Sequence, residues 1–352
     1  MAKMMKGNEA IGEAAVRNGV RFYAGYPITP SSEIMEYLSW RLAEVGGSFV
    51  QTENEIAGIS MVYGAASCGV RAMTASSGNG ISLMQETISV LADEELSAVI
   101  ITMVRYGNGL ATLFSSQTDY LRETRGGGHG DYRCFVLCPH TVQEAVDMVG
   151  LAYELAEKYR MVSIIMAEGS LGQMMEPVDL PEFQEPKRMP WGLDGTYTRQ
   201  KVGYFDRDSL KEAVEINEKY DRIKENEQRW ESFYVDDAEY VFVGYGLSGR
   251  SCLGAVKELR EEGYKVGLIR PITVWPYPEK AFREMNPNVK GLISVEANAT
   301  GQMVEDVAMY SKKALEQNVP VYCLPYVYGI PVIKDVKADF KKILAGEIKE
   351  VF

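Results

Sequence analysis

Short apolar runs and amphipathic stretches alternate along the first 166 residues. The apolar runs are rich in β-branched residues, which is typical of strands buried on both faces of a sheet. They predict strands at residues 21–26, 48–52, 71–76, 96–104, 134–138 and 161–166. The amphipathic stretches predict helices at residues 7–18, 31–44, 54–67, 81–91 and 141–158. Repeated strand–helix units predict a parallel sheet with helices on both faces.

A second α/β unit is predicted near the end of the chain. It follows a polar, proline-containing stretch at residues 169–205 and a strongly charged helix at residues 208–230, which together are typical of a connector. Its predicted strands are at residues 240–245, 265–270, 291–296 and 319–324, and its predicted helices are at residues 250–262 and 303–315. We therefore expect an α/β protein with a parallel-sheet domain, a linker and a smaller α/β domain at residues 1–190, 191–235 and 236–352.

Composition and charge exclude two classes of partner. The chain has 352 residues, of which 46% are hydrophobic and 24% charged, and its net charge is −12. No basic cluster stands out, whereas nucleic-acid binding requires a concentrated positive field. No apolar run reaches the roughly 18–20 residues of a membrane-spanning helix, and residues 1–9 resemble no targeting signal. We expect a cytoplasmic protein that binds neither nucleic acid nor membrane.

The five cysteines indicate a reducing compartment rather than a disulfide framework, because their number is odd and no two form a CxxC pair. Cys134 and Cys138 lie in an apolar run and are expected to be buried thiols. We therefore expect no iron–sulfur cluster on this chain. With two histidines in the sequence, metal or triad chemistry based on histidine is also disfavoured.

Polar or glycine-rich segments follow the predicted strands of the first domain. In open parallel sheets, ligands bind beyond the carboxyl ends of the strands. The segments are residues 26–30, 52–55, 76–80 and 105–107. We expect them to converge on one site.

Each segment also has a purely structural interpretation. Thr29 followed by Pro30 is typical of a helix N-cap, and a helix N-terminus suits an anion, but Thr29 can equally serve as a cap alone. Thr52 and Glu55 have the spacing of a capping box, in which Glu55 would bond back to the backbone instead of facing a cofactor.

The same ambiguity holds for the next two strand ends. Residues 76–80 favour either a close approach of the backbone to a ligand or an ordinary turn. Arg105 suits bidentate binding of a carboxylate, and a structural ion pair is the alternative.

Residues 244–249 read Gly-Tyr-Gly-Leu-Ser-Gly, a formal GxGxxG motif between a predicted strand and a helix. The pattern is typical of dinucleotide binding. However, the next strand ends at Arg270 and Pro271, without the acidic residue that would hold a ribose hydroxyl. A nucleotide-binding regulator is therefore a minor alternative.

The ordered set of segments resembles a known family. Residues 26–31, Tyr-Pro-Ile-Thr-Pro-Ser, resemble the hallmark of the pyrimidine-binding domain in 2-oxoacid:ferredoxin oxidoreductases, which depend on thiamine diphosphate. Residues 55–58, residues 74–78 and Arg105 follow in the family's order. The second domain resembles the transketolase C-terminal domain at residues 243–246, 268–271 and 275–276.

The resemblance implies roles for individual residues. Glu55 matches the glutamate that bonds the aminopyrimidine of thiamine diphosphate and is the expected catalytic residue. Positions expected to bind the 2-oxoacid are Thr29, Arg105, Tyr26 and Ser31. Positions expected to bind the cofactor are Glu55, Ser77 and Gly78. Whether Ser77 or Gln117 contacts substrate stays open.

The resemblance also implies partners, because the family anchors the diphosphate through Mg2+ with a Gly-Asp-Gly motif that this sequence lacks. The implied partners are a β-type subunit that supplies Mg2+ and binds the diphosphate and an iron–sulfur cluster, a γ-type subunit with a CoA domain, and a ferredoxin-like subunit or soluble ferredoxin. The implied reaction converts a 2-oxoacid, CoA and oxidised ferredoxin to acyl-CoA, CO2 and reduced ferredoxin.

Two loops bear on the substrate. Residues 126–133 resemble the glycine-rich loop of subunits that act on branched-chain 2-oxoacids, and residues 106–112 differ from the loop usual in 2-oxoglutarate subunits. The expected substrate is therefore 3-methyl-2-oxobutanoate. A 2-oxoglutarate-oxidising subunit is the first alternative, and a non-catalytic scaffold subunit is an alternative of another class.

Overall fold

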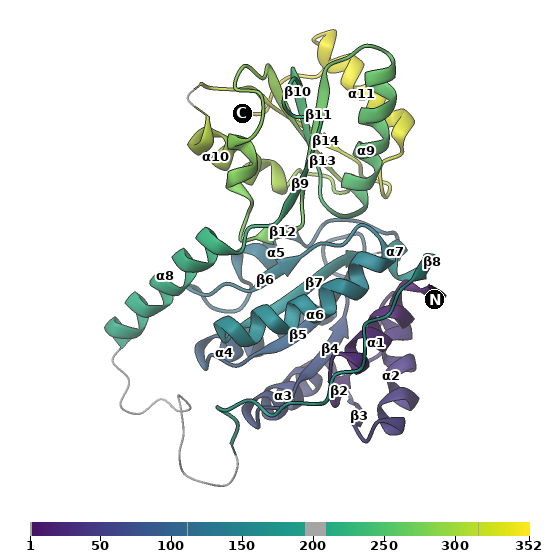
Figure 1. Ribbon diagram of the computed structural model, residues 1–352, viewed down its shortest axis with the longest axis vertical. Helices are drawn as coiled ribbons and strands as arrows, with labels where there is room; N and C mark the ends of the chain where they lie inside the picture. Colours follow the sequence, from purple (N-terminus) through teal and green to yellow (C-terminus); the bar gives the residue numbers. More distant parts are fainter. Residues whose placement is uncertain (1, 111, 194–208, 316) are drawn as a thin grey trace.

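The computed structural model describes residues 2–110, 112–193, 209–315 and 317–352. Parallel strands form its first sheet, in the order β12-β6-β7-β5-β4-β2-β3, with antiparallel β12 at one edge (Figure 1). The parallel strands are β2 (Phe22–Gly25), β3 (Ser48–Gln51), β4 (Ala72–Ser76), β5 (Ala98–Val104), β6 (Phe135–Leu137) and β7 (Val162–Glu168). β4, β5, β6 and β7 are buried along their whole length, so the predicted parallel α/β class is confirmed.

Helices cover both faces of this sheet. Because crossovers between parallel strands are right-handed, the direction of each step along the sheet decides which face its helix covers. One face carries α1 (Gly7–Arg17), α2 (Ser32–Glu44) and α6 (Val142–Tyr159), with α1 packed between the other two. The opposite face carries α3 (Glu55–Ser67) and α4 (Gly78–Asp93), which pack on each other.

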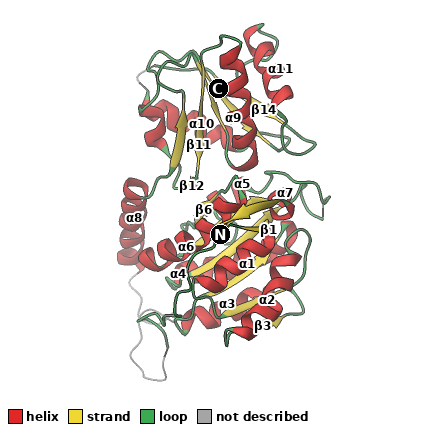
Figure 2. Cartoon of the chain, turned by 45° about the vertical axis from the view of Figure 1, so that its right-hand side comes forward, coloured by secondary structure: helices red, strands yellow, loops and turns green. Residues whose placement is uncertain are grey.

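The second sheet has the order β14-β13-β10-β11-β9 and is parallel except for β9. Its strands are β9 (Trp230–Phe233), β10 (Tyr240–Val243), β11 (Val266–Pro271), β13 (Gly291–Glu296) and β14 (Val321–Pro325). Its helices are α9 (Gly246–Glu261), α10 (Met303–Ala314), α11 (Ile333–Leu344) and the short 3-10 helix η1 (Glu279–Arg283). Figure 2 shows this smaller unit stacked on the first along the long axis of the molecule.

Several elements were not predicted. β1 (Lys3–Lys6) pairs with β8 (Met175–Val178), and α5 (Tyr120–Arg125) and α7 (Gly169–Gln173) are short helices inside loops. The expected linker, residues 191–235, contains α8 (Ser209–Asn226) but also β9, which pairs with β11 of the second sheet. Residues 194–208 of the expected connector lie outside the described part of the chain.

The two units share backbone and buried charge. β12 (Thr273–Trp275) comes from the second half of the chain, yet it pairs with β6 and extends the first sheet. The guanidinium of Arg270 is buried between Glu144 of α6, at 2.7 Å, and Glu231 of β9, at 2.8 Å. The units are therefore tied together along this edge.

Gln117 lies between the units and is 1% exposed. Its amide nitrogen donates to Glu168 Oε1 at 2.6 Å and to the carbonyl of Tyr245 at 3.0 Å. Its amide oxygen accepts from Ser248 Oγ at 2.9 Å and from the backbone N–H of Ala297 at 3.0 Å. One side chain from the first unit thus bonds three residues of the second, which come from two segments of its chain.

Glu168 lies at the same joint, at the end of β7. Its carboxylate accepts from the backbone N–H of Leu247 at 3.0 Å, in the first turn of α9. Complete burial raises the pKa of Glu168 to about 7, although the hydrogen bonds from Gln117 and Leu247 act in the opposite direction. The joint therefore contains a carboxyl group that titrates near neutral pH.

A raised pKa in the folded state makes the protein less stable as pH rises. Between about pH 4.5, the ordinary value of a glutamate, and about pH 7, the unfolded chain releases the Glu168 proton while the folded chain keeps it. Glu168→Gln removes this group. The free energy of unfolding of the variant minus that of the wild type should therefore be about 2–3 kcal/mol larger at pH 8 than at pH 4. Urea unfolding at several pH values measures the difference. A difference that stays constant with pH would contradict the assignment.

Candidate functional site

The polar segments after β2, β3, β4 and β5 lie at one edge of the first sheet, because these strands are neighbours and run parallel. Arg105, directly after β5, makes the contacts that join them. Its Nη1 donates to the carbonyl of Thr29 at 2.8 Å, and its Nη2 donates to Asn79 Oδ1 at 2.9 Å and to the carbonyl of Leu110 at 3.2 Å. These partners are neutral oxygens, so the structure does not show the ion pair that was the structural alternative for Arg105.

Arg105 keeps one donor for a ligand. Within the described residues, its buried Nε has no hydrogen-bond partner. A Cβ placed on Gly78 would lie 3.2 Å from this Nε, and Gly78 has a φ of +46°. Glycine at this position therefore keeps space open beside a buried, positively charged donor.

The prediction that Thr29 is the N-cap of the following helix is wrong. α2 begins at Ser32, and Ser31 occupies the cap position without a side-chain bond to the helix. Thr29 lies in a turn ahead of the helix, because its carbonyl is bonded by Arg105 and the carbonyl of Pro30 accepts from Asn8 Nδ2 at 2.8 Å. The chain is held here by two long-range bonds rather than by a cap.

The remaining predicted residues of this loop differ in availability. The hydroxyl of Ser31 donates to the carbonyl of Ile28 at 2.8 Å, inside the loop, and Ser31 is buried. The ring of Tyr26 is exposed at the mouth of the site. Tyr26 is thus the better placed of the two to meet a ligand or a partner protein.

Glu55 is not part of a capping box. The N-cap of α3 is Asn54, whose side chain accepts from the backbone N–H of Ala57 at 2.9 Å, and the Thr52 hydroxyl donates to the carbonyl of Asn54 at 2.8 Å. The Glu55 side chain is buried and lies against Gly80: a Cβ on Gly80 would be 2.6 Å from Glu55 Oε1 and would overlap Ser76 Oγ. The carboxylate is therefore turned inward, toward the segment after β4.

Unpaired buried hydroxyls lie in the segment that faces this carboxylate, with Ser76 nearest to it. Within the part of the chain that the structure describes, the hydroxyls of Thr74, Ser76 and Ser77 have no hydrogen-bond partner. Buried polar groups in folded proteins are almost always bonded, so unpaired hydroxyls beside a buried carboxylate indicate a polar ligand. A nitrogen heterocycle such as an aminopyrimidine has the donors and acceptors that such a set would satisfy.

Two predicted regions have structural roles. Gln117 is fully bonded in the joint between the units, so its amide has no donor or acceptor left for a substrate. The glycine-rich loop at residues 126–130 packs on α4, because a Cβ on Gly128 would overlap the carbonyl of Gln85. The Tyr132 hydroxyl accepts from the N–H groups of Gly127 and Gly128, which fixes the loop.

The GxGxxG motif does not present a free nucleotide site. The N-terminus of α9 is occupied by the Glu168 carboxylate, which a Cβ on Gly246 would overlap. Gly246 has a φ of +52°, and a Cβ on Gly249 would overlap the carbonyl of Gly244. The glycines are required by packing, and this contradicts the nucleotide-binding alternative.

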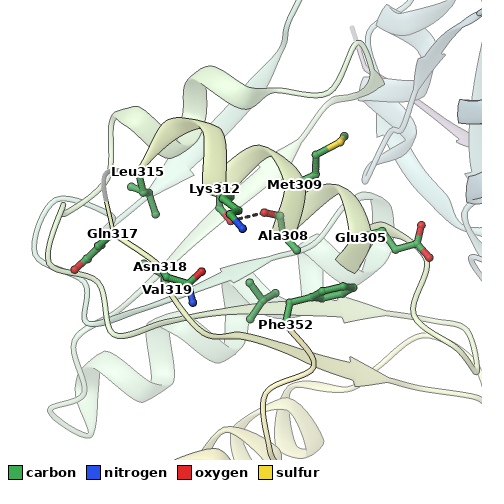
Figure 3. Close-up of a pocket in the computed structure, with 11 residues that line it drawn as sticks. Glu305, Ala308, Met309, Lys312, Leu315, Gln317, Asn318, Val319 and Phe352 are labelled. Atoms are coloured by element: carbon green, nitrogen blue, oxygen red, sulfur yellow. Dashed lines mark hydrogen bonds between the residues drawn. The ribbon is translucent and has the colours of Figure 1, made fainter.

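Among the described residues, no helix is long and apolar enough to cross a membrane, and no group of three His, Cys, Asp or Glu residues is arranged to hold a metal. A cavity of about 600 Å3 lies between α10 and the C-terminal residue Phe352, where Met309 and Lys312 also line it (Figure 3). It contains none of the predicted site residues.

Comparisons with known proteins agree with this geometry. Residues 13–240 match the family described as pyruvate flavodoxin/ferredoxin oxidoreductase, thiamine diphosphate-binding, and residues 238–330 match pyruvate:ferredoxin oxidoreductase core domain II. The chain belongs to this oxidoreductase family. The fold prediction and the family resemblance are both confirmed.

Relatives within the family have two assigned substrates. The ketoisovalerate oxidoreductase subunit VorB of Methanothermobacter thermautotrophicus is 47% identical over 316 residues, which cover 88% of this chain and 90% of the relative. The 2-oxoglutarate synthase subunit KorA of Methanocaldococcus jannaschii is 36% identical over 347 residues, covering 89% and 93%. The chain also superimposes on 2-oxoglutarate:ferredoxin oxidoreductase from Magnetococcus marinus with a TM-score of 0.86 and 24% identity, covering 97% of this chain and 65% of that one.

Gly80 is expected to be essential to the position of Glu55. Gly80→Ala should destabilise the chain by about 1–3 kcal/mol, because the new methyl group overlaps Ser76 Oγ and presses on Glu55. Gly64→Ala is the matched control: Gly64 is exposed on α3 with open space around it, and alanine there should be neutral or stabilising by about 0.5–1 kcal/mol. Urea unfolding of the purified chains measures both values, and equal stabilities would contradict the packing argument.

Proposed function

We propose that this chain is the α-type subunit of a 2-oxoacid:ferredoxin oxidoreductase and provides the substrate and aminopyrimidine side of a thiamine diphosphate site. The observation that carries the proposal is the convergence of Glu55, Arg105 and unpaired buried hydroxyls at one edge of the first sheet. Membership of a thiamine diphosphate-binding family supports it.

The residues fit such a cofactor. Glu55, with Ser77 and Gly78, would hold the aminopyrimidine, because a buried carboxyl group can share a proton with a ring nitrogen and keep the ring oriented. Bound thiamine diphosphate supplies the carbanion chemistry that decarboxylation of a 2-oxoacid requires. Arg105 would hold the substrate carboxylate through its free Nε, with Tyr26, Thr29 and Ser31 forming the loop beside it.

A partner must complete the site. The sequence contains no Gly-Asp-Gly motif, so we assign Mg2+ and the diphosphate to a β-type subunit. The proposed docking surface is the outer face of α3 and α4, where Ile56, Met61 and Leu83 are exposed. α3 is apolar around its whole circumference, and a helix of that kind is normally buried.

The electron-transfer groups are assigned to partners as well. All five cysteines are unpaired, as suits the proposed cytoplasmic location, and burial raises the pKa of the Cys134 and Cys138 thiols, which disfavours the thiolates that a cluster needs. The β-type subunit would carry an iron–sulfur cluster, a γ-type subunit the CoA domain, and a ferredoxin-like subunit or soluble ferredoxin would accept the electrons. The names of the relatives as subunits support an assembly of this kind.

The proposed substrate is 3-methyl-2-oxobutanoate or another branched-chain 2-oxoacid, because identity is higher to the ketoisovalerate subunit than to the 2-oxoglutarate subunit. The 2-oxoglutarate alternative is supported by the KorA relatives. Testing 3-methyl-2-oxobutanoate, 2-oxoglutarate, pyruvate and arylpyruvates on the complex co-purified with this chain separates them. Turnover of none of these 2-oxoacids would overturn the proposed function and favour a scaffold role.

Glu55→Gln should reduce turnover of the reconstituted complex by at least about a hundredfold, because the amide cannot take the place of the carboxylate at the ring nitrogen. The control is Glu53→Gln, which changes an exposed glutamate two residues away and should keep near-normal turnover. Size-exclusion chromatography checks that both complexes assemble. Near-normal activity of Glu55→Gln would remove Glu55 from the cofactor site.

Arg105→Ala should raise KM for every 2-oxoacid by roughly tenfold or more, since the carboxylate that all of them share loses its cation. Arg105→Lys should recover part of that loss, because lysine keeps the charge without the bonds to Asn79 and Leu110. Steady-state kinetics on the 2-oxoacid that the complex turns over gives KM. An unchanged KM in Arg105→Ala would exclude a carboxylate role.

A further inference from the structure

The loop that follows Arg105 is a closed hairpin. Arg105 and Ser115 form an antiparallel bridge, and the N–H of Tyr106 donates to the carbonyl of Phe114 at 2.7 Å. The N–H of Thr112 donates to the carbonyl of Tyr106 at 3.0 Å. Its described residues, 106–110 and 112–115, are therefore held next to the proposed carboxylate site.

Both ends of this hairpin are anchored. The Ser115 and Ser170 hydroxyls are 2.8 Å apart, and the Thr118 hydroxyl donates to the carbonyl of Arg105 at 3.2 Å. Gln117 then fixes the chain to the second unit. The side chains at the tip are thus presented by a framework that includes both sheets.

Leu110 stands out at this tip. Its carbonyl accepts the 3.2 Å hydrogen bond from Arg105, but its side chain is 80% exposed. The sequence between Arg105 and Asp119 contains no charged residue. A branched apolar residue is therefore bonded to a buried cation through its backbone while its side chain stays outside the core, and the residues between Arg105 and Asp119 offer no cation for a second carboxylate.

We propose that Leu110 is a specificity-determining residue that packs against the hydrocarbon side chain of the 2-oxoacid whose carboxylate Arg105 holds. The proposal rests on the function proposed above and deepens it. Contact with Leu110 favours a branched alkyl group by burying apolar surface. The same contact disfavours 2-oxoglutarate, because its second carboxylate would be desolvated against leucine without a partner.

Phe114 provides a matched control in the same hairpin. It is apolar and 66% exposed, and it precedes Ser115, which is paired with Arg105 across the bridge. Side chains directly opposite each other in an antiparallel pair share a face, and the next residue along the chain faces the other way. Phe114 thus lies on the face away from the Arg105 side chain, although its exposure resembles that of Leu110.

The test is the ratio of kcat/KM values for two substrates within one preparation of the complex, because the fraction of active enzyme cancels in that ratio. Leu110→Ala should lower the preference for 3-methyl-2-oxobutanoate over pyruvate by about tenfold. Leu110→Lys should raise the ratio of kcat/KM for 2-oxoglutarate to kcat/KM for 3-methyl-2-oxobutanoate by at least about tenfold, since lysine supplies the missing cation. Phe114→Ala should leave both ratios within about twofold of the wild type.

The outcomes are separable. Wild-type ratios in both Leu110 variants would overturn the role of Leu110 while leaving the proposed function intact, and so would equal changes in Phe114→Ala. A wild-type complex that turns over no 2-oxoacid would overturn the proposed function and this inference with it. If Leu110→Lys does not assemble, Leu110→Ser is the second polar variant, with a lowered preference for 3-methyl-2-oxobutanoate over pyruvate as its expected result.

Discussion

The hydrogen bonds of one guanidinium organise the candidate site. Arg105 leaves the end of β5 and bonds the loop after β2 through Thr29, the segment after β4 through Asn79, and its own hairpin through Leu110. Three chain segments thus converge on a single cation. These partners are neutral oxygens, and among the described residues no carboxylate is within ion-pair distance of Arg105, so an unpaired donor remains for an anion. The hydrogen bonds that fix the loops therefore also hold the guanidinium in position to bind an anion.

A second set of bonds connects this site to the rest of the molecule. The hairpin that begins at Arg105 leads directly to Gln117, which bonds Tyr245, Ser248 and Ala297 of the second unit. The position of the second unit is consequently coupled, through a few residues of chain, to the loop beside the substrate cation. The buried carboxyl of Glu168 belongs to this joint, which explains why the glycines of the GxGxxG motif are used for packing rather than for a nucleotide.

Local patterns predicted the repeated elements and the convergence of the strand ends, because both follow from apolar periodicity and parallel pairing. They did not identify the cap residues: Thr29 has the composition of an N-cap, but long-range bonds hold its segment outside the helix. Local patterns could not predict the hydrogen bonds between the two units either, because the partners of Gln117 lie far away in the chain. α11 was not predicted, although Val336, Phe340 and Ile343 repeat at helical spacing and are buried.

The polarity of the site is the physical reason to expect that it binds a ligand. Glu55 is buried at the end of an apolar sheet together with the hydroxyls of Ser76 and Ser77, and leaving such hydroxyls unpaired costs about 1–3 kcal/mol each. Folding alone gains nothing from this arrangement, so its stabilisation has to come from whatever the groups bind. α3, which begins at Glu55, also carries the exposed apolar side chains of Ile56 and Met61. Covering that face would exclude water from the carboxylate next to it, so binding of the partner and binding of the cofactor are expected to reinforce each other.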